Sequence, residues 1–337
     1  FHSILISNPI NSQYLSWFKG SLGYLLITEK ECRLSTDSRY SIQAETESAQ
    51  FEVITVTSQT PWPLAITEGL NLKNIAFESE DITVENLKYL EDKTPYKWIP
   101  SPNIISSLRS IKDDEELETI QKAINIADNS FNAISENIKP GDTEKEIAWE
   151  LEKHIRMQGA ESLSFETIVA SGPNSAKPHH SPSNRKIREG EPIVIDMGAK
   201  FSGYCSDLTR TICIGKPDEK YNKIYDTVFI AQLTTIETLE KGMTGKGIDN
   251  LARSIITDSG FGENFGHSLG HGVGLEVHEN PGVGPTSENI IEENMVFTVE
   301  PGIYIENWGG VRIEDIVSIK NGETKIMSNA KKNKILD

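Results

Sequence analysis

Apolar residues in the middle of the chain recur at helical spacing. After Lys112 they follow an i, i+3, i+4, i+7 series, which predicts an amphipathic helix whose buried face carries Leu117, Ile120, Ala123, Ile124, Ala127 and Phe131. Asp113–Glu116 place negative charge in its first turn, where the helix dipole favours it. Thr143 and Glu146 then match a capping box, so we expect a second helix that runs to about Met157.

The same pattern returns 101 residues further along the chain. A third long helix is expected at Glu219–Leu239, and residues 242–260 match residues 141–159 at five positions, Thr143 with Thr244 among them. Each copy is expected to contain a helix, an N-capped helix and a strand-rich segment. Such a duplication predicts a pseudo-twofold domain with a site between its halves.

Residues 193–215 contain two apolar, β-branched runs joined by a turn around Ser202–Gly203, and they predict a β-hairpin. Each run carries one aspartate, Asp196 and Asp207, in an apolar context. Pairing the strands is expected to bring the two carboxylates side by side. Because like charges repel, this arrangement favours a hard divalent cation between them. The alternative is that both aspartates end their strands in solvent.

Five of the seven histidines fall in two short stretches, SAKPHHSP and GHSLGHGVGLEVHE, and these are His179, His180, His267, His271 and His278. Glycines are dense in the second stretch, which disfavours a helix and lets backbone approach a ligand closely. HSLGH has the i, i+4 spacing of a helical zinc site, but it lacks the glutamate of the HExxH motif. A zinc protease of that type is therefore disfavoured.

Two further acids follow in apolar runs. Glu300 ends the run VFTVE, and Glu314 is expected inside a strand, on the same face as Arg312. A salt bridge between Glu314 and Arg312 is the simpler alternative for that site. Asp315 breaks the alternation on the other face, and we interpret it as a strand residue with a local partner.

The acids and one histidine suit a two-metal site better than a single zinc. Four carboxylates and one imidazole favour two divalent cations bridged by carboxylates and a water, and the residues are Asp196, Asp207, His271, Glu300 and Glu314. Bridging lowers the pKa of the water and makes a hydroxide nucleophile. The expected chemistry is hydrolysis.

The N-terminal hundred residues show a different pattern of apolar positions. Short strand-like runs such as YLLIT and FEVITVT predict a mixed α/β region, and prolines at 95, 100 and 102 indicate a linker. The boundary is expected between about residues 98 and 110, and we divide the chain into domains 1–104 and 105–337.

Amino-acid composition limits the kinds of partner that the protein can bind and the cellular compartment in which it is expected. The formal charge of −17 argues against nucleic acid or an anionic membrane as the main partner. The chain contains no apolar run of the roughly 18–20 residues that a membrane span needs. Its three cysteines are odd in number and show no CxxC spacing, which predicts a reduced cytoplasm.

The order of the segments IDMGAKFSGYCSDLTRT, HSLGHGVGLEVHE, TVEPGIY and GGVRIEDIV resembles the pita-bread metallopeptidases, in the Xaa-Pro aminopeptidase and prolidase branch. The resemblance covers most of residues 105–330. Residues 1–100 resemble that branch's N-terminal domain more weakly, through TDSRY and the following Gln43. It implies an α+β fold: a duplicated pita-bread domain of helices and antiparallel sheet, preceded by a smaller creatinase-like α/β domain.

The resemblance also assigns roles to residues. It implies the same five ligands, with Glu300 also carrying a proton between the attacking water and the leaving amine. His179 would contact the substrate near the scissile bond, and His278 would bind its carbonyl and stabilise the tetrahedral intermediate. Arg312 would lie beside the last glutamate and His267 would face the substrate. His180 has no assigned role.

The expected function is hydrolysis of the bond between an N-terminal residue and proline, in dipeptides or in longer peptides. Methionine aminopeptidase activity is a second hypothesis, because that group shares the five ligands. A non-catalytic peptide-binding module and a metal-free creatinase-like hydrolase are disfavoured by the intact ligand set. The metal ions are expected to be Mn²⁺ or Co²⁺, with Zn²⁺ or Fe²⁺ as alternatives. The resemblance implies a homodimer in which one subunit's N-terminal domain contributes to the other's site.

Overall fold

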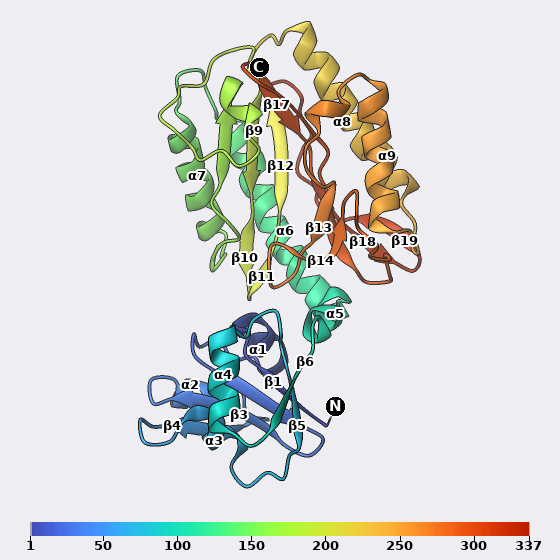
Figure 1. The fold of residues 1–337 in the computed structure, drawn as a ribbon. Coiled ribbons are helices and arrows are strands. Elements are labelled where there is room, and N and C mark those ends of the chain that lie inside the picture. The colour runs from blue at the N-terminus through green and yellow to red at the C-terminus, as the bar shows by residue number, and fades with distance from the viewer. Residues whose placement is uncertain (1, 337) are drawn as a thin grey trace. The chain divides into compact units, whose positions relative to one another are not determined.

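The computed structural model describes residues 2–336, and the chain divides into two compact units, Phe1–Arg109 and Ser110–Asp337 (Figure 1). The division follows the density of contacts along the chain. The domain boundary expected at residues 104/105 stays a prediction, because contacts locate compact units and not the point at which two domains separate.

The N-terminal unit is built on one mixed sheet. Within its described residues, this sheet has six strands in the order β4-β3-β2-β1-β5-β6. The strands are β1 (Ser3–Ile6), β2 (Tyr24–Thr28), β3 (Cys32–Asp37), β4 (Glu52–Val56), β5 (Asn74–Phe77) and β6 (Lys97–Pro100). The helices are α1 (Pro9–Ser16), α2 (Ser41–Glu47), α3 (Trp62–Thr67), α4 (Val84–Lys93) and α5 (Ile104–Ser110), which runs one residue past this unit.

Alternation along the strands gives this sheet a buried core on each face. Leu5 and Leu26 pack in one apolar cluster, and their neighbours Ile6 and Leu25 pack in another. Because successive strand residues point to opposite faces, the two clusters lie on opposite sides of the sheet. Helices therefore cover both faces, as expected for the mixed α/β region.

Four long helices organise the C-terminal unit, and they confirm the predicted repeat of capped helices. They are α6 (Asp114–Ser135), α7 (Glu144–Met157), α8 (Glu219–Thr238) and α9 (Gly245–Asp258) in the described residues. Thr143 caps α7 in a complete capping box with Glu146, and Thr244 caps α9 at the matching position. Helix α9 begins and ends 101 residues after α7, at the offset predicted from the sequence.

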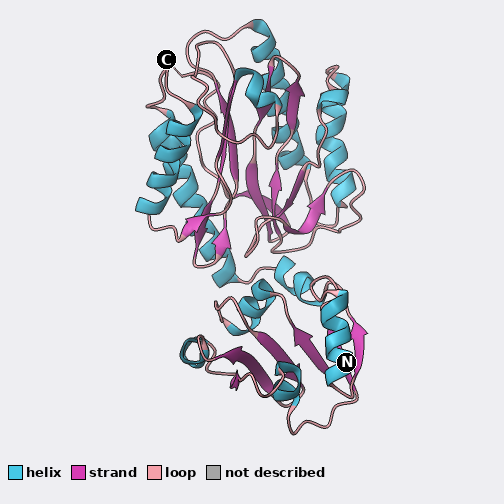
Figure 2. Cartoon of the chain, turned by 60° about the vertical axis from the view of Figure 1, so that its left-hand side comes forward, coloured by secondary structure: helices cyan, strands magenta, loops and turns pink. Residues whose placement is uncertain are grey.

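Strands fill the space between these helices. Figure 1 shows α7 and α9 on opposite sides of this unit with strands between them, and Figure 2 shows the same layering from a second direction. The two main sheets have the strand orders β12-β9-β8 and β14-β13-β15-β18-β19. Their strands are β8 (Ile168–Ser171), β9 (Ile193–Met197), β12 (Leu208–Ile212), β13 (Gly270–Gly272), β14 (Glu279–Val283), β15 (Val296–Val299), β18 (Asp315–Lys320) and β19 (Glu323–Ile326).

Smaller elements connect the two main sheets. Strands β7 (Ser162–Leu163), β10 (Ala199–Phe201) and β11 (Tyr204–Cys205) pair together, as do β16 (Gly302–Ile305) and β17 (Gly309–Arg312). Two 3₁₀ turns, η1 (Gly172–Ala176) and η2 (Gly262–Asn264), lie in the described connections. Each half then has its own core, because Ile147 and Leu151 of α7 pack with Ile195 of β9, whereas α8 and α9 pack with β15 and β18.

The predicted hairpin is present, but its register differs from the expected one. Phe201 pairs with Tyr204 around a turn at Ser202–Gly203, and both turn residues have positive φ. Further along, Asp196 lies opposite Thr209, so Asp207 is its diagonal neighbour. The expectation of side-by-side carboxylates was wrong by two residues, because the turn is closer to Asp207 than to Asp196. Both still point to one face, since strand side chains repeat every two residues.

None of the helices among residues 2–336 combines the length and the apolar character that crossing a membrane requires.

Candidate metal centre

All nine residues predicted for the site line a single cavity of about 870 Å³ in the C-terminal unit. They are His179, Asp196, Asp207, His267, His271, His278, Glu300, Arg312 and Glu314. His179 and His267 also line a neighbouring cavity of about 390 Å³. The structure therefore brings together residues that span 136 positions of the sequence.

The ends and breaks of strands place the candidate ligands. Asp196 lies in β9, Asp207 directly precedes β12, and Glu300 directly follows β15. His271 is the central residue of β13. Glu314 was expected inside a strand, but Ile313 and Glu314 lie between β17 and β18. At this break the chain passes from the sheet of β16 and β17 into that of β15, so the carboxylate leaves the regular strand face.

Glycines on either side of His271 allow its strand to pack closely. A Cβ atom on Gly270 would overlap the carbonyl oxygen of Thr298, and one on Gly272 would overlap the carbonyl oxygen of Asn280. Only glycine fits these two positions without moving the neighbouring backbone. These glycines therefore permit close packing against neighbouring backbone of the protein itself, and the expected close approach of backbone to a ligand stays a prediction.

Three candidate ligands already cluster at distances suitable for a metal. One ligand atom from each of Asp207, His271 and Glu314 lies within 4.8 Å of the others. The Nε2 atom of His271 is 3.7 Å from Oδ2 of Asp207 and 3.3 Å from Oε1 of Glu300. Carboxylate oxygens and an imidazole nitrogen are donors that divalent transition metals accept.

Asp196 provides a separate test of whether the site fits a cation. Its Oδ2 atom accepts a hydrogen bond of 2.5 Å from Nη2 of Arg312. Its Oδ1 atom is buried and has no hydrogen-bond partner among residues 2–336. A buried carboxylate oxygen without a partner costs free energy, which a bound cation removes. The residues present therefore fit a metal.

The electrostatics of the cavity lead to the same conclusion. Burial raises the pKa of Asp207 well above its usual value, and the nearby charges of Glu314 and Asp196 raise it further. Burial and the charges of Glu300 and Asp196 likewise raise the pKa of Glu314 well above its usual value. Carboxylates this crowded cannot all ionise without a compensating positive charge. Divalent cations supply that charge.

Arg312 and Thr209 hold the acids in place. Thr209 donates from Oγ1 to Oε2 of Glu314 at 2.7 Å and accepts from Nε of Arg312 at 3.0 Å. Arg312 forms its ion pair with Asp196. The simpler alternative was that Glu314 is in this position because it forms an ion pair with Arg312. The structure shows the ion pair of Arg312 with Asp196 instead. Asp315 has local partners as predicted, in Arg210 and Lys332.

The remaining histidines lie around this cluster. The His278 ring centroid is 4.0 Å from that of His271, and burial together with the charge of His271 lowers the pKa of His278. Nε2 of His267 is 3.0 Å from the hydroxyl of Tyr304, which accepts a 2.8 Å hydrogen bond from Nη1 of Arg312. Burial also lowers the pKa of His267. Both rings are thereby favoured in the neutral form, which can donate one hydrogen bond and accept another.

Sequence reasoning did not single out Thr209, Tyr304 or Glu144, although each contacts a residue of the cavity. Thr209 could have been found, since it lies two residues after Asp207 on the same strand face. Tyr304 sits in the apolar run GIYI and carried no signal that separates it from a core residue. Glu144 resembled an ordinary acid in the first turn of a helix.

Comparison with known proteins identifies the family. The sequence pattern of metallopeptidase family M24 matches residues 118–321, and that of the creatinase/prolidase N-terminal domain matches residues 1–111. The chain is 39% identical to the Xaa-Pro dipeptidase of Pyrococcus furiosus over 329 residues, which is 96% of this chain and 92% of the relative.

Two solved structures agree with this assignment. The Xaa-Pro dipeptidase from Bacillus anthracis superposes with a TM-score of 0.96 at 38% identity, covering 100% of this chain and 95% of that one. The X-Pro aminopeptidase from Thermotoga maritima MSB8 has a TM-score of 0.92 at 39% identity, covering 99% and 97%. These matches confirm the predicted pita-bread fold with a creatinase-like N-terminal domain. The chain belongs to metallopeptidase family M24, whose members use divalent metal ions.

Proposed function

We propose that this protein hydrolyses the peptide bond between an N-terminal residue and proline, as a metal-dependent exopeptidase. The observation that carries the proposal is the single cavity in which four carboxylates and an imidazole lie beside further histidines. Relatives that match nearly the whole chain bear the names Xaa-Pro dipeptidase and X-Pro aminopeptidase. Their names supply the substrate class, and the cavity supplies the chemistry.

Five residues are proposed to hold two divalent cations: Asp196, Asp207, His271, Glu300 and Glu314. The unpartnered Oδ1 atom of Asp196 and the cluster of Asp207, His271 and Glu314 support this assignment. Manganese or cobalt suits such an oxygen-rich site, and zinc or iron is an alternative. When bound, the cations activate a water molecule and polarise the substrate carbonyl.

The chain's own residues are proposed to carry the proton and to orient the peptide. Glu300 would move a proton from the attacking water to the proline nitrogen as it leaves. Although burial opposes ionisation, the nearby His271 lowers the pKa of Glu300, which favours the base form at neutral pH. His278 would donate to the substrate carbonyl oxygen as negative charge develops there.

His179 and His267 are proposed to contact the substrate where the large cavity meets the smaller one. Both histidines also line the smaller cavity, so they lie between the two cavities. Arg312 would contribute to substrate binding from its position beside Asp196 and Tyr304, to both of which it donates a hydrogen bond.

A homodimer in a reducing cytoplasm completes the proposal. The free state of Cys32, Cys205 and Cys213 is compatible with a reducing compartment. The homodimer rests on the family resemblance. Light scattering after size exclusion tests it, and a stable monomer with full activity would overturn it.

The decisive experiment compares a Xaa-Pro dipeptide with a Xaa-Pro-Xaa tripeptide, using chelated enzyme and enzyme reconstituted with Mn²⁺ or Co²⁺. Cleavage of the dipeptide alone identifies a dipeptidase, and preference for the tripeptide identifies an aminopeptidase. If metal binds but neither peptide is cleaved, the proposal fails. Methionyl peptides are then the next substrates to assay.

A further inference from the structure

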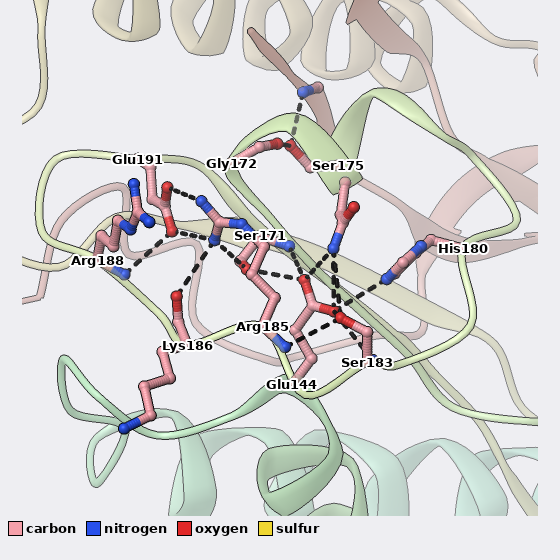
Figure 3. Close-up of polar contacts among 12 residues, drawn as sticks. Glu144, Ser171, Gly172, Ser175, His180, Ser183, Arg185, Lys186, Arg188 and Glu191 are labelled. Atoms are coloured by element: carbon pink, nitrogen blue, oxygen red, sulfur yellow. Dashed lines mark hydrogen bonds and ion pairs between the residues drawn. The ribbon is translucent and has the colours of Figure 1, made fainter. Parts of the chain in front are cut away.

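A buried glutamate at the start of α7 gathers donors from separate parts of the chain. The Glu144 side chain is fully buried, and Figure 3 shows the donors converging on its carboxylate. One oxygen accepts from the backbone nitrogen and hydroxyl of Ser171 at 2.8 and 2.7 Å. The other accepts from the backbone nitrogen and hydroxyl of Ser183 at 3.0 and 2.6 Å. Asn174 donates to both oxygens.

His180 completes this cluster. Its Nε2 atom lies 2.9 Å from Oε2 of Glu144, and its side chain is 10% exposed. His180 directly follows His179, and both residues line the large cavity. The ring next to the proposed substrate contact is therefore tied to a buried anion.

The segment that carries these histidines has little regular structure of its own. Residues 177–183 lie outside any helix or strand. The backbone nitrogen of His180 bonds to the carbonyl of Lys177, and the carbonyl of Ser183 accepts from Lys145. The contacts of His180 and Ser183 with Glu144 therefore supply much of what orders the segment.

The hydrogen bonds to Glu144 favour its charged form. Burial opposes ionisation, but the hydrogen bonds from Ser183, Asn174, His180 and Ser171 outweigh it and lower the pKa of Glu144 to about 2. Hydrogen bonds that favour the charged form act in this direction. Glu144 is thus a permanent acceptor at neutral pH.

We propose that Glu144 and His180 form a positioning pair that sets the place of His179 in the active site. The proposal rests on the proposed function, in which His179 contacts the substrate. Fixing the His180 ring fixes the peptide unit between the two histidines, which leaves His179 directed into the cavity. Small misplacements of a group beside the reacting bond cost rate steeply.

A double-mutant cycle in kcat/KM for a Xaa-Pro peptide tests the pair on metal-loaded, full-length enzyme. We expect His180→Ala to lower kcat/KM about tenfold in the wild type and by less than about twofold in the His179→Ala background. His180→Gln keeps a donor that reaches Glu144, and we expect it to recover most of the loss. Equal losses in both backgrounds would overturn the proposal.

A matched control comes from the same polar cluster. Glu191 accepts from Arg185, which also donates to Ser171. Within residues 2–336, Glu191 forms no hydrogen bond or ion pair with either histidine. Glu191→Gln should therefore lower the melting temperature without changing kcat/KM. A loss of kcat/KM equal to that of His180→Ala would mean that general destabilisation explains the effect.

Amide exchange separates failure of this inference from failure of the proposed function. If the wild-type enzyme does not cleave Xaa-Pro peptides, the function fails, but exchange across residues 177–183 still reports on the pair. We expect exchange there to be about tenfold faster in His180→Ala and in Glu144→Gln than in Glu191→Gln. Unchanged exchange in both variants would overturn the positioning role.

Discussion

Arg312 determines the arrangement of the acids at the level of single residues. Its guanidinium contacts Asp196, Thr209 and Tyr304 through different nitrogens, so one planar cation orders three side chains. Arginine suits this task because its donors are fixed in a fork. Thr209 in turn donates a hydrogen bond to Glu314 and so fixes the position of that carboxylate.

Asp207→Asn is expected to remove metal and activity while the fold is kept. Asparagine retains the shape of aspartate but lacks the negative charge that binds a cation. Because burial and nearby acids already raise the pKa of the Asp207 carboxyl, a neutral side chain is tolerated at this position and the fold is kept. We expect kcat/KM to fall by about 10³-fold. Metal content by mass spectrometry, together with peptide hydrolysis, checks this.

Asp258→Asn, an exposed change at the end of α9, is the control for Asp207→Asn. It should leave both metal content and rate unchanged. Full activity in Asp207→Asn would remove Asp207 from the ligand set.

His278→Ala is expected to lose rate but keep metal. The ring lies against that of His271, yet His278 is not among the proposed ligands. Removing one donor to a developing oxyanion costs about 10²–10³-fold in kcat. Metal content and kcat measured on one preparation check the prediction. A metal-depleted His278→Ala protein would show that the residue supports the ligands instead.

At the scale of elements, the duplicated helices share positions but not all of their chemistry. Oγ1 of Thr143 accepts a hydrogen bond from the backbone nitrogen of Glu146 at 3.2 Å, and the Glu146 carboxylate accepts one from the backbone nitrogen of Thr143 at 2.8 Å. Thr244 accepts from Gly247 in the same way. Glycine has no side chain to return a bond, so α9 has half of the capping box that α7 has.

Thr143→Ala is therefore expected to destabilise the C-terminal unit more than Thr244→Ala. We expect losses of about 1–2 kcal/mol for the first and about 0.5–1 kcal/mol for the second. Urea unfolding of both variants checks the difference. Thr257→Ala, an exposed change inside α9, controls for loss of a threonine, and equal losses in the two cap variants would contradict the prediction.

At the scale of the whole molecule, buried charge makes stability depend on pH. Asp128 of α6 is 4% exposed, and its Oδ2 atom accepts from the backbone of Asn329, which ties α6 to the C-terminal segment. Burial raises the pKa of Asp128 to about 6. The folded state thus holds this proton more tightly than the unfolded chain does, and the contribution of Asp128 to stability falls as pH rises from about 4 through 6.

Asp128→Asn should reveal this effect as a difference between two pH values. Between pH 8 and pH 5, the wild type is expected to gain about 1–2 kcal/mol of unfolding free energy relative to the variant. Urea unfolding at both pH values checks it, with Asp258→Asn as the control. A difference that does not change with pH would mean that Asp128 titrates normally.

Local signals explain which parts of the fold could be predicted. The cap at Thr143, the periodic residues of α6 and the turn at Ser202–Gly203 each act within a few residues of one another, so the pattern contains the whole interaction. The register of the hairpin required the exact turn geometry, and a shift of two residues changed which side chain faces Asp196. The break between β17 and β18, which contains Glu314, could not be predicted because it arises where the chain leaves one sheet and joins another.

The helices, the duplication and the residue types of the metal site could be predicted because each signal lies within a short stretch of sequence. Which distant groups come into contact depends on the packing of the folded chain. Lys112 and Glu279, 167 residues apart, form a buried 2.7 Å ion pair beside His278, and Glu144 reaches His180 across 36 residues. Such contacts depend on how the helices and sheets of the unit pack, and no local pattern contains that information.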